Sequence, residues 1–369
     1  MKKKFLCVFL SALLLLGLVA CGGGEETTAP QESKTAGETG ESVNAPATDD
    51  PVKVCIVYSG SLGDKSYNDS CNEGAQRAVK ELGVEVKNLE ATADAAEWKA
   101  NLLSAAEDGY DLVICSSSNF EEYLKEIAPA YPNVKFAIID TTVAGDNVVS
   151  ISFAQNQGSF LAGAAAAMFT TKTDIDGINE DKVIGWVGGM DIPVLHDFFV
   201  GYEQGAKYID PDIQILQSFA GAWNDPLKGK ELTLAQFDQG ADIVMNVASG
   251  TGPGILEAAA EAGKYAIGVD LDQDDYQPGH VLTSQLKRVD SACYMVIKSV
   301  VDGTFQGNSV SYLDIAHDGV SLTDFSVMRK ALGDKFPEDI VEKIAELEEK
   351  IASGEIVVEN YEGFGPSAS

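Results

Sequence analysis

The chain has 369 residues, of which 45% are hydrophobic and 22% charged, and its formal net charge is −31. The length allows two domains, and the composition is that of a soluble globular protein. The net negative charge excludes a nucleic-acid-binding surface, which needs a basic face. It also excludes attachment to anionic lipid through a polybasic segment.

The amino terminus has the pattern of a secretory signal. Lysines at positions 2–4 precede an apolar run over residues 5–18, which is too short to span a membrane comfortably. Leu18-Val-Ala-Cys21 is similar to the bacterial lipobox, in which the cysteine is diacylated, and two acyl chains anchor a protein stably. We predict a signal peptide over residues 1–20 and lipidation at Cys21; the alternative is an ordinary signal peptide with an incidental cysteine.

Residues 21–50 form the predicted tether. After Cys21 they are rich in Gly, Thr, Ser, Glu and Pro, so they cannot bury a core and should be disordered. As a flexible coil they reach roughly 30 Å, which would hold the folded part close to the extracytoplasmic face of the cell membrane. In the folded part the cysteine spacing matches no metal motif, and we predict buried free thiols at Cys55, Cys71, Cys115 and Cys293.

From residue 52 onward, short apolar strands alternate with amphipathic helices. We predict strands over residues 52–57, 84–89, 111–115, 135–140, 148–153, 183–187, 214–219, 243–247, 265–269, 281–285 and 309–315. We predict helices over residues 72–82, 95–108, 120–131, 158–170, 198–208, 226–239, 254–262, 289–302 and 337–353. Near-continuous apolar strands between helices indicate an α/β fold with parallel sheets covered on both faces.

Residues 58–74 follow the first strand and lead into the first long helix, which is expected to begin near Tyr67, to run to about residue 82 and to be capped by Ser66 or Asn68. Glycines in this loop let the backbone approach a ligand. Asp64, Tyr67 and Asn68 stand where the strand ends, which is where open α/β sheets bind ligands. We interpret the loop as part of a small-molecule site; the alternative is the first turn that any α/β domain needs.

Small, polar or aromatic residues also follow the other predicted strands. They include Asn119, Phe120 and Asp140 in the first unit and Trp223, Gly250, Thr251, Asp270 and Asp272 in the second. Two sets of strand ends that face each other make a cleft between lobes, the usual place for a ligand.

The aromatic and acidic members of this set suit a planar ligand with hydroxyl groups. Loop aromatics such as Tyr67 and Trp223 stack on planar rings, worth roughly 1–3 kcal/mol per base; the alternative is hinge or core packing. The carboxylates of Asp270 and Asp272 suit the vicinal hydroxyls of a ribose; the alternative is helix capping.

Signals for other chemistry are weak. Residues 250–254, Gly-Thr-Gly-Pro-Gly, precede a helix and could hold a phosphate. They lack the Lys-Ser/Thr of a P-loop, so we favour a tight turn. The three histidines show neither a nucleophile elbow nor metal-ligand spacing. We therefore predict no catalytic residue, no metal and no cofactor.

Eight motifs occur in order along the chain. They are Gly63-Asp-Lys-Ser-Tyr-Asn68, Phe136-Ala-Ile-Ile-Asp140, Gly158-Ser-Phe-Leu-Ala-Gly163, Gly188-Gly-Met190, Asn224-Asp-Pro226, Gly250-Thr-Gly252, Gly268-Val-Asp-Leu-Asp-Gln273 and Lys287-Arg-Val-Asp290. With them, residues 52–314 closely resemble the basic membrane protein (BMP) family of substrate-binding lipoproteins. The resemblance implies a type I periplasmic-binding-protein fold with two lobes and one cleft. Characterised relatives bind purine nucleosides for ABC import.

The resemblance also implies roles for single residues. Tyr67 and Trp223 stand where the family has aromatics that stack on the base. Asn68, Asp270 and Lys287 match polar ligand contacts, the last two on the ribose side.

Two departures from the family pattern bear on the ligand. Relatives usually place a base-reading aspartate just after the first strand, where this chain has Tyr58-Ser59, and we expect Ser59 to contact the ligand instead. Both stacking phenylalanines are replaced by larger, polar-edged aromatics.

We predict a monomeric, membrane-tethered receptor that delivers a purine nucleoside to an ABC permease and is no enzyme. The alternatives are a receptor for a sugar or other small polar ligand on the same fold, and a nucleoside-processing enzyme. We expect one lobe over residues 51–153 and 286–313, a second over 154–285 and 314–369, and hinge closure on the ligand.

Overall fold

The computed structural model describes residues 50–92 and 95–362. The predicted signal peptide, Cys21 and the predicted tether up to residue 49 lie outside the described residues. Within the described ranges, no helix is long and apolar enough to cross a membrane. The four cysteines of the folded part are buried free thiols, as predicted: Cys55, Cys71, Cys115 and Cys293.

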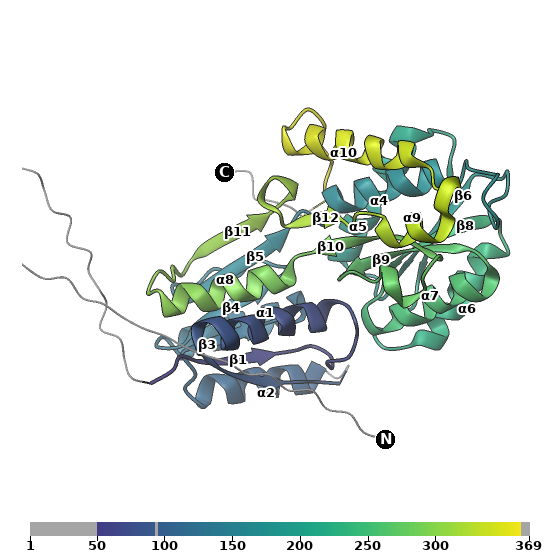
Figure 1. Ribbon diagram of the computed structural model, residues 1–369. Coiled ribbons are helices and arrows are strands. Elements are labelled where there is room, and N and C mark those ends of the chain that lie inside the picture. Colours follow the sequence, from purple (N-terminus) through teal and green to yellow (C-terminus); the bar gives the residue numbers. More distant parts are fainter. Residues whose placement is uncertain (1–49, 93–94, 363–369) are drawn as a thin grey trace, which may run out of the picture. The chain divides into compact units, whose positions relative to one another are not determined.

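The first sheet has six parallel strands in the order β11-β5-β4-β3-β1-β2 (Figure 1). Its strands are β1 (Lys53–Val57), β2 (Glu85–Leu89), β3 (Leu112–Cys115), β4 (Lys135–Ile139), β5 (Val148–Phe153) and β11 (Ser309–Leu313). Helices α1 (Tyr67–Leu82) and α8 (Val289–Val301) cover one face of this sheet. Helices α2 (Ala95–Glu107) and α3 (Glu121–Ile127) cover the other. We call this sheet with its helices the first lobe.

The second lobe repeats the arrangement with the strand order β12-β10-β9-β8-β6-β7. Its strands are β6 (Val183–Gly188), β7 (Gln214–Phe219), β8 (Ala241–Val247), β9 (Tyr265–Asp270), β10 (Val281–Lys287) and β12 (Val320–Leu322), and only β12 pairs antiparallel among them. Helices α4 (Gln155–Phe169) and α5 (Pro193–Ile209) cover one face and α6 (Pro226–Phe237) and α7 (Gly252–Ala262) the other. The remaining helices are α9 (Ser326–Leu332) and α10 (Glu338–Ala352), and α10 lies beside α4 (Figure 1).

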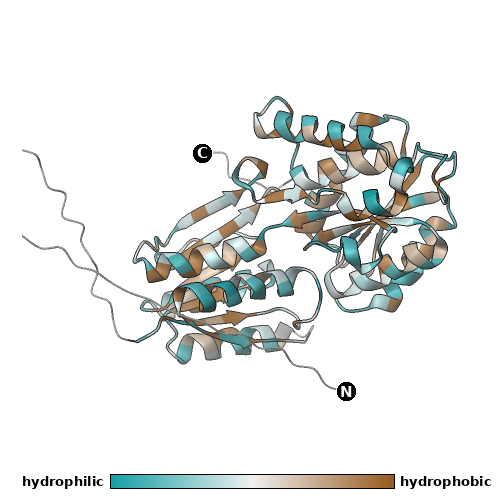
Figure 2. Ribbon diagram, in the orientation of Figure 1, coloured by the Kyte–Doolittle hydropathy of each residue, from teal (hydrophilic) through white to brown (hydrophobic). Residues whose placement is uncertain are grey.

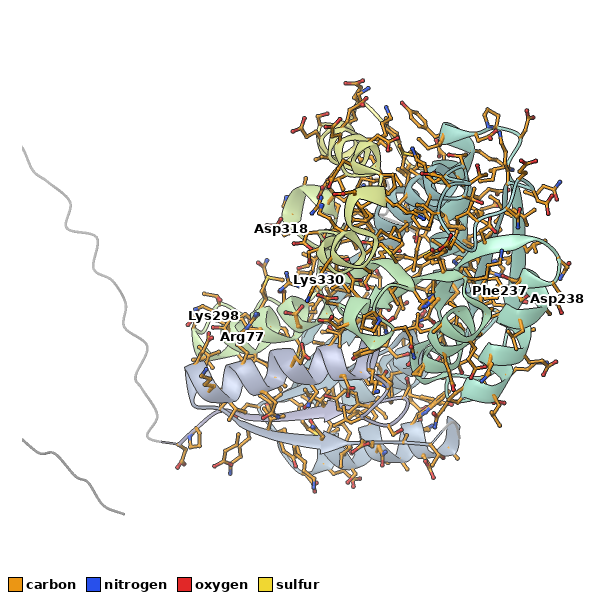
Figure 3. All side chains as sticks on the ribbon, turned by 45° about the vertical axis from the view of Figure 1, so that its right-hand side comes forward. Arg77, Phe237, Asp238, Lys298, Asp318 and Lys330 are labelled. Carbon is orange, nitrogen blue, oxygen red and sulfur yellow. The ribbon has the colours of Figure 1, made fainter. Side chains whose placement is uncertain are left out.

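The central strands form because they are buried on both faces, as parallel sheets require, whereas the edge strands β2, β7 and β11 are partly exposed. In β1, Val54 and Ile56 pack toward α1 and α8, whereas Cys55 and Val57 pack toward α2 and α3, and all four are fully buried. Apolar residues run along the strands, and polar residues mark the outer sides of helices such as α1 and α10 (Figure 2). Charged side chains on these outer surfaces include Arg77 of α1, seen near Lys298 of α8 in Figure 3.

The structure differs from the predicted elements at several places. The single helix predicted over residues 120–131 is wrong: α3 ends at Ile127 and a 3₁₀ turn over Ala128–Ala130 follows, because Pro129 lacks the N–H that an α-helix needs. Strand β12 and helix α9 were not predicted, since three and seven residues are too short for a clear period. Strand β10 continues to Lys287 in the second sheet, slightly past the predicted change of lobe at residue 286.

Candidate ligand-binding site

A cavity lies where residues at the carboxyl ends of both sheets come together. The space between its lining residues, the opening to solvent included, is about 670 Å³. Both lobes supply predicted site residues to its wall: Ser59, Tyr67, Asn68 and Asp140 from the first, and Trp223, Asp270 and Lys287 from the second. The structure thus gathers residues that are far apart in the sequence around one space.

The other predicted residues lie outside the cavity wall: Asp64, Asn119, Phe120, Gly250, Thr251 and Asp272. Asp64 instead caps α1, because its carboxylate accepts hydrogen bonds from the main-chain N–H groups of Ser66 and Asn68 at 3.0 and 2.9 Å. This replaces the predicted caps, since the side chain of Ser66 makes no capping bond. Phe120 is fully buried in the core between β3 and α2, with its ring 6.4 Å from that of Trp98.

The residues near position 250 shape the turn rather than the cavity. The Thr251 hydroxyl accepts a bond from the Asp225 N–H at 2.9 Å and lies 3.1 Å from the Ala222 oxygen, to which it donates. A side chain at Gly250 would lie 3.1 Å from Asn224 Oδ1, so this position serves close packing, as the tight-turn interpretation expects. Asp272 is exposed, and its Oδ1 accepts a hydrogen bond from the main-chain N–H of Asp274 at 3.0 Å.

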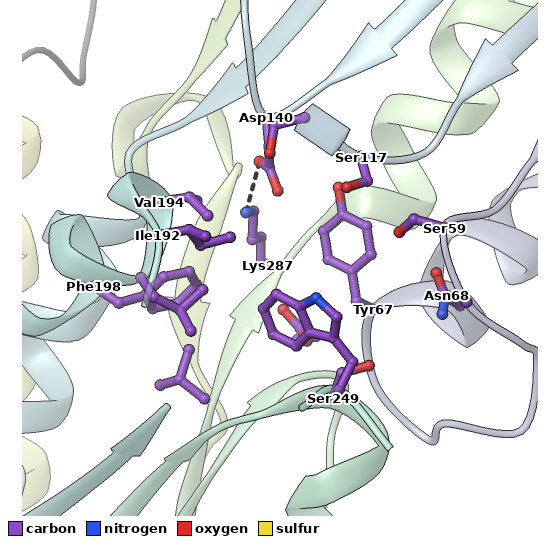
Figure 4. Close-up of a pocket in the computed structure, with 16 residues that line it drawn as sticks. Ser59, Tyr67, Asn68, Ser117, Asp140, Ile192, Val194, Phe198, Ser249 and Lys287 are labelled. Atoms are coloured by element: carbon purple, nitrogen blue, oxygen red, sulfur yellow. Dashed lines mark ion pairs between the residues drawn. The ribbon is translucent and has the colours of Figure 1, made fainter. Parts of the chain in front are cut away.

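Sequence reasoning missed an apolar wall. Ile192, Val194, Leu195 and Phe198 line the cavity from the first turns of α5, together with Val247. Figure 4 shows Ile192, Val194 and Phe198 on one side of the cavity and Ser59, Asn68 and Ser117 on the opposite side. The predicted helix began at residue 198, whereas α5 begins at Pro193. A proline at the first helical position is a start signal and could have revealed this wall.

Ser117, Ser118 and Ser249 also line the cavity; they belong to the small and polar residues after the predicted strands but were not among the predicted ligand contacts. Serines are common in loops, so only the three-dimensional arrangement distinguishes these three.

A buried ion pair joins the lobes inside the cavity. Lys287 Nζ lies 2.7 Å from Asp140 Oδ1, and the two residues are 1% and 6% exposed (Figure 4). The same Nζ lies 5.4, 5.1 and 5.3 Å from the ring centroids of Tyr67, Phe153 and Phe198, where an ammonium group is attracted to aromatic faces. Lys287 is thereby held in one place at the cavity wall, with its charge compensated.

Two aspartates occupy equivalent places in the two lobes. Asp140 follows β4 and Asp270 ends β9, and these strands hold the same position in their sheets. Both have positive φ, 70° for Asp140 and 66° for Asp270, which costs an ordinary residue roughly 1–2 kcal/mol. Such backbone strain clusters at functional sites, so the backbone geometry marks this pair independently of the cavity.

Burial in the cavity raises the pKa values of both Tyr67 and Asp270. Burial first, and then the charge of Asp140, raises the pKa of Tyr67 well above its usual value, so its hydroxyl remains a donor. Burial raises the pKa of Asp270 to about 6, although the charge of Lys287 and a hydrogen bond from Ser66 act in the opposite direction.

The indole of Trp223 packs against Gly189. A Cβ at Gly189 would lie 2.5 Å from Trp223 Cε3, so the indole can contact the turn after β6 only because that position has no side chain. The remaining surface of the indole is half-buried and lines the cavity.

Comparison with known proteins agrees with this geometry. Residues 51–362 match the family model described as "ABC transporter substrate-binding protein PnrA-like", abbreviated Bmp. The chain belongs to this family. It is 34% identical to an uncharacterised lipoprotein of Pyrococcus abyssi over 97% of this chain and 92% of that one. It is 28% identical to basic membrane protein A2 of Borrelia garinii over 85% of this chain and 90% of that one.

Solved structures confirm the predicted fold. A solute-binding protein of an ABC transporter system from Aeropyrum pernix superposes with a TM-score of 0.78 at 30% identity, over 84% of this chain and 94% of that one. A carbohydrate-transporter solute-binding protein from Agrobacterium radiobacter, solved with D-arabinose, superposes with a TM-score of 0.60 at 18% identity, over 80% of this chain and 99% of that one. The second likeness concerns the fold alone. The Bmp chain described here is thus an ABC transporter solute-binding protein with the type I periplasmic-binding-protein fold.

Proposed function

We propose that this solute-binding protein takes up a purine nucleoside between its lobes and delivers it to an ABC permease. The observation that carries the proposal is the two-sided cavity wall, with apolar and aromatic residues facing polar ones and charged groups between them. A nucleoside has the complementary chemistry, because its base has flat apolar faces and polar edges while its ribose carries hydroxyl groups. A pentose alone would leave the apolar wall of α5 without a matching surface.

The base would stack on Tyr67 and Trp223, which line the cavity from different lobes. Stacking on such rings contributes roughly 1–3 kcal/mol per base. Since each ring belongs to one lobe, a base held between them would stabilise the closed arrangement over the open one, and binding would drive hinge closure.

The ribose would be held by Asp270. Its Oδ2 accepts a hydrogen bond from Ser66 Oγ, which leaves Oδ1 as the oxygen available to a ribose hydroxyl. Hydrogen bonds to charged groups contribute about 1.5–3 kcal/mol. Lys287, fixed against Asp140, would donate to a second oxygen of the sugar. The polar edge of the base would meet Asn68 and Ser59, in place of the aspartate that relatives usually have.

A thermal-shift screen tests the proposal. Purine nucleosides should raise the melting temperature because a ligand that binds only the folded protein stabilises it by mass action. Pentoses and free bases are the comparison compounds, and each sample is analysed afterwards for breakdown of the nucleoside. A shift with pentoses and none with nucleosides would favour the sugar receptor, and turnover of bound nucleoside would favour an enzyme.

We further propose that Cys21 is diacylated and anchors the protein at the extracytoplasmic face of the membrane. The lipobox-like Leu18-Val-Ala-Cys21 supports this, as does the lipoprotein name of the relative from Pyrococcus abyssi. A monomeric, lipid-anchored receptor would present its cleft to the permease. We also propose that the chain passes from one lobe to the other near residues 154, 286 and 314.

A further inference from the structure

A polar junction joins the two lobes beside the ligand cavity. Among the described residues, three hydrogen bonds cross it. They run from Ser249 Oγ to Asp64 Oδ2 (2.8 Å), from Ser66 Oγ to the Asp270 carboxylate, and from Gln273 Nε2 to the main-chain oxygen of Lys65 (2.9 Å). On the first lobe all three end within residues 64–66, the turn directly ahead of α1.

Gln273 is anchored firmly in the second lobe. Its residue is 1% exposed, its main-chain N–H donates to Ser284 Oγ at 3.0 Å, and its Oε1 accepts from Val269 N at 3.0 Å and Asn246 Nδ2 at 3.2 Å. A Cβ at Gly268 would lie 2.9 Å from Gln273 Cβ, so the strand leaves room for this side chain. The amide NH₂ is therefore a fixed donor that points out of the second lobe.

The acceptor on the first lobe is equally well fixed. Lys65 has a φ of 55°, and its N–H donates to Asp69 Oδ2 at 2.8 Å, while Gly63 N–H donates to Asp69 Oδ1 at 2.8 Å. Because Asp69 lies in α1, the turn moves with the helix as one body. The next residues of that helix, Tyr67 and Asn68, line the cavity.

We propose that Gln273 is a positioning residue for ligand binding, whose amide holds the Lys65 carbonyl and thereby seats Tyr67 over the cavity in the closed form. A fixed donor meets a fixed acceptor at only one relative placement of the lobes, so this bond favours complete closure over partial closure. Gln273 lies behind the cavity wall, so it acts through the turn and touches no ligand. The inference rests on the proposed function only for the choice of adenosine as a probe.

The test compares two buried glutamines of the second lobe. Gln273→Glu keeps the acceptor bonds of Oε1 and replaces the donor to Lys65 by an oxygen. The matched control is Gln236→Glu: Gln236 is 2% exposed and its Nε2 donates to the Trp186 main-chain oxygen at 3.1 Å, inside the second lobe. Both variants lose a buried amide donor to a carbonyl, but only the first loses a bond between lobes.

The first measurement needs no ligand. Hydrogen exchange of the peptide over residues 62–69, followed by mass spectrometry on the full chain, reports opening of the junction, because the N–H groups of Ser66 and Asn68 are bonded to Asp64, a carboxylate that is 7% exposed and accepts a hydrogen bond from Ser249 of the second lobe. Gln273→Glu should exchange at least about three to ten times faster than wild type, since that is the factor expected for one net neutral hydrogen bond and the introduced oxygen also faces the Lys65 oxygen. Gln236→Glu should exchange in this peptide as wild type does. The second measurement is the dissociation rate of adenosine, which should rise by the same factor in Gln273→Glu alone.

Because a protonated carboxyl group could still donate to the Lys65 oxygen, the proposal is overturned by wild-type exchange in a folded Gln273→Met protein, and also by equal acceleration in Gln273→Glu and Gln236→Glu. If the introduced charge prevents folding, Gln273→Met carries the same test without a charge. If adenosine fails to bind wild type, the proposed ligand is wrong, while the exchange measurement still decides the role of Gln273.

Discussion

Replacing Asp270 by asparagine should stabilise the folded protein while it weakens nucleoside binding. Burial raises the pKa of Asp270 from its usual 3.8 to about 6, so the folded protein holds this proton more tightly than the unfolded chain does. The stability that the protonated group contributes is therefore complete below about pH 4 and is lost as the pH rises through about 6. Asparagine carries no charge, so its contribution to stability does not change over this pH range.

The magnitude follows from the pKa difference. About two pKa units at 1.36 kcal/mol each correspond to about 3 kcal/mol. The φ of 66° at position 270 is a conformation that asparagine tolerates well, so the substitution adds little backbone strain. We expect the free energy of unfolding of Asp270→Asn to exceed that of wild type by up to about 3 kcal/mol at pH 7. This difference should vanish near pH 4.

Urea unfolding of both proteins at pH 4, 5.5 and 7 measures this difference. Asp272→Asn is the matched control, because it removes an exposed carboxylate two residues away and surface substitutions usually change stability by less than about 0.5 kcal/mol. In calorimetry Asp270→Asn should bind adenosine at least about tenfold more weakly, since a charged acceptor is lost. A stability difference that is the same at all three pH values would refute the reasoning.

Three further predictions concern stacking, anchoring and closure. Trp223→Ala should weaken adenosine and adenine alike, by about tenfold for a stacking contribution of roughly 1–3 kcal/mol; calorimetry that finds unchanged affinity for both would remove the indole from the site. Cys21→Ala should move the protein from salt-washed membranes to the soluble fraction, since the acyl chains are lost; complete retention on membranes would mean a different anchor. Saturating adenosine should reduce the radius of gyration in small-angle scattering, because the ligand contacts both lobes; an unchanged radius would count against hinge closure.

The sequence was sufficient to predict the sheets because their central strands are buried on both faces. Runs such as Val54–Val57 are apolar at every position, and an apolar run between helices has few other interpretations. The carboxyl ends of such strands meet at one edge, so the residues after them could be expected to gather, as Asp140 and Asp270 do.

The site was predicted less well where one residue type serves two purposes. Phe120 and Tyr67 are both aromatic residues near a strand end, but the first is fully buried in the core and the second lines the cavity. Asp64 in the loop after β1 and Asp270 at the end of β9 are both carboxylates near strand ends, but the first caps a helix. Local sequence does not distinguish these cases, because burial depends on which helix packs over the position.

Contacts between the lobes could not be predicted at all. Lys287 and Asp140 form their ion pair across the cleft, and Gln273 reaches Lys65 in the same way. Neither pair shares a helix face or a strand register, so no periodicity links them. Only the placement of the two sheets brings them together.

The central claim is that the cavity holds a base and a ribose at the same time. Isothermal titration calorimetry of the wild-type protein with adenosine, adenine and ribose tests it most directly. Because the rings of Tyr67 and Trp223 and the carboxylate of Asp270 line one space, the account predicts that adenosine binds at least about tenfold more tightly than either part alone. Ribose that binds as tightly as adenosine, or adenosine that does not bind, would contradict it.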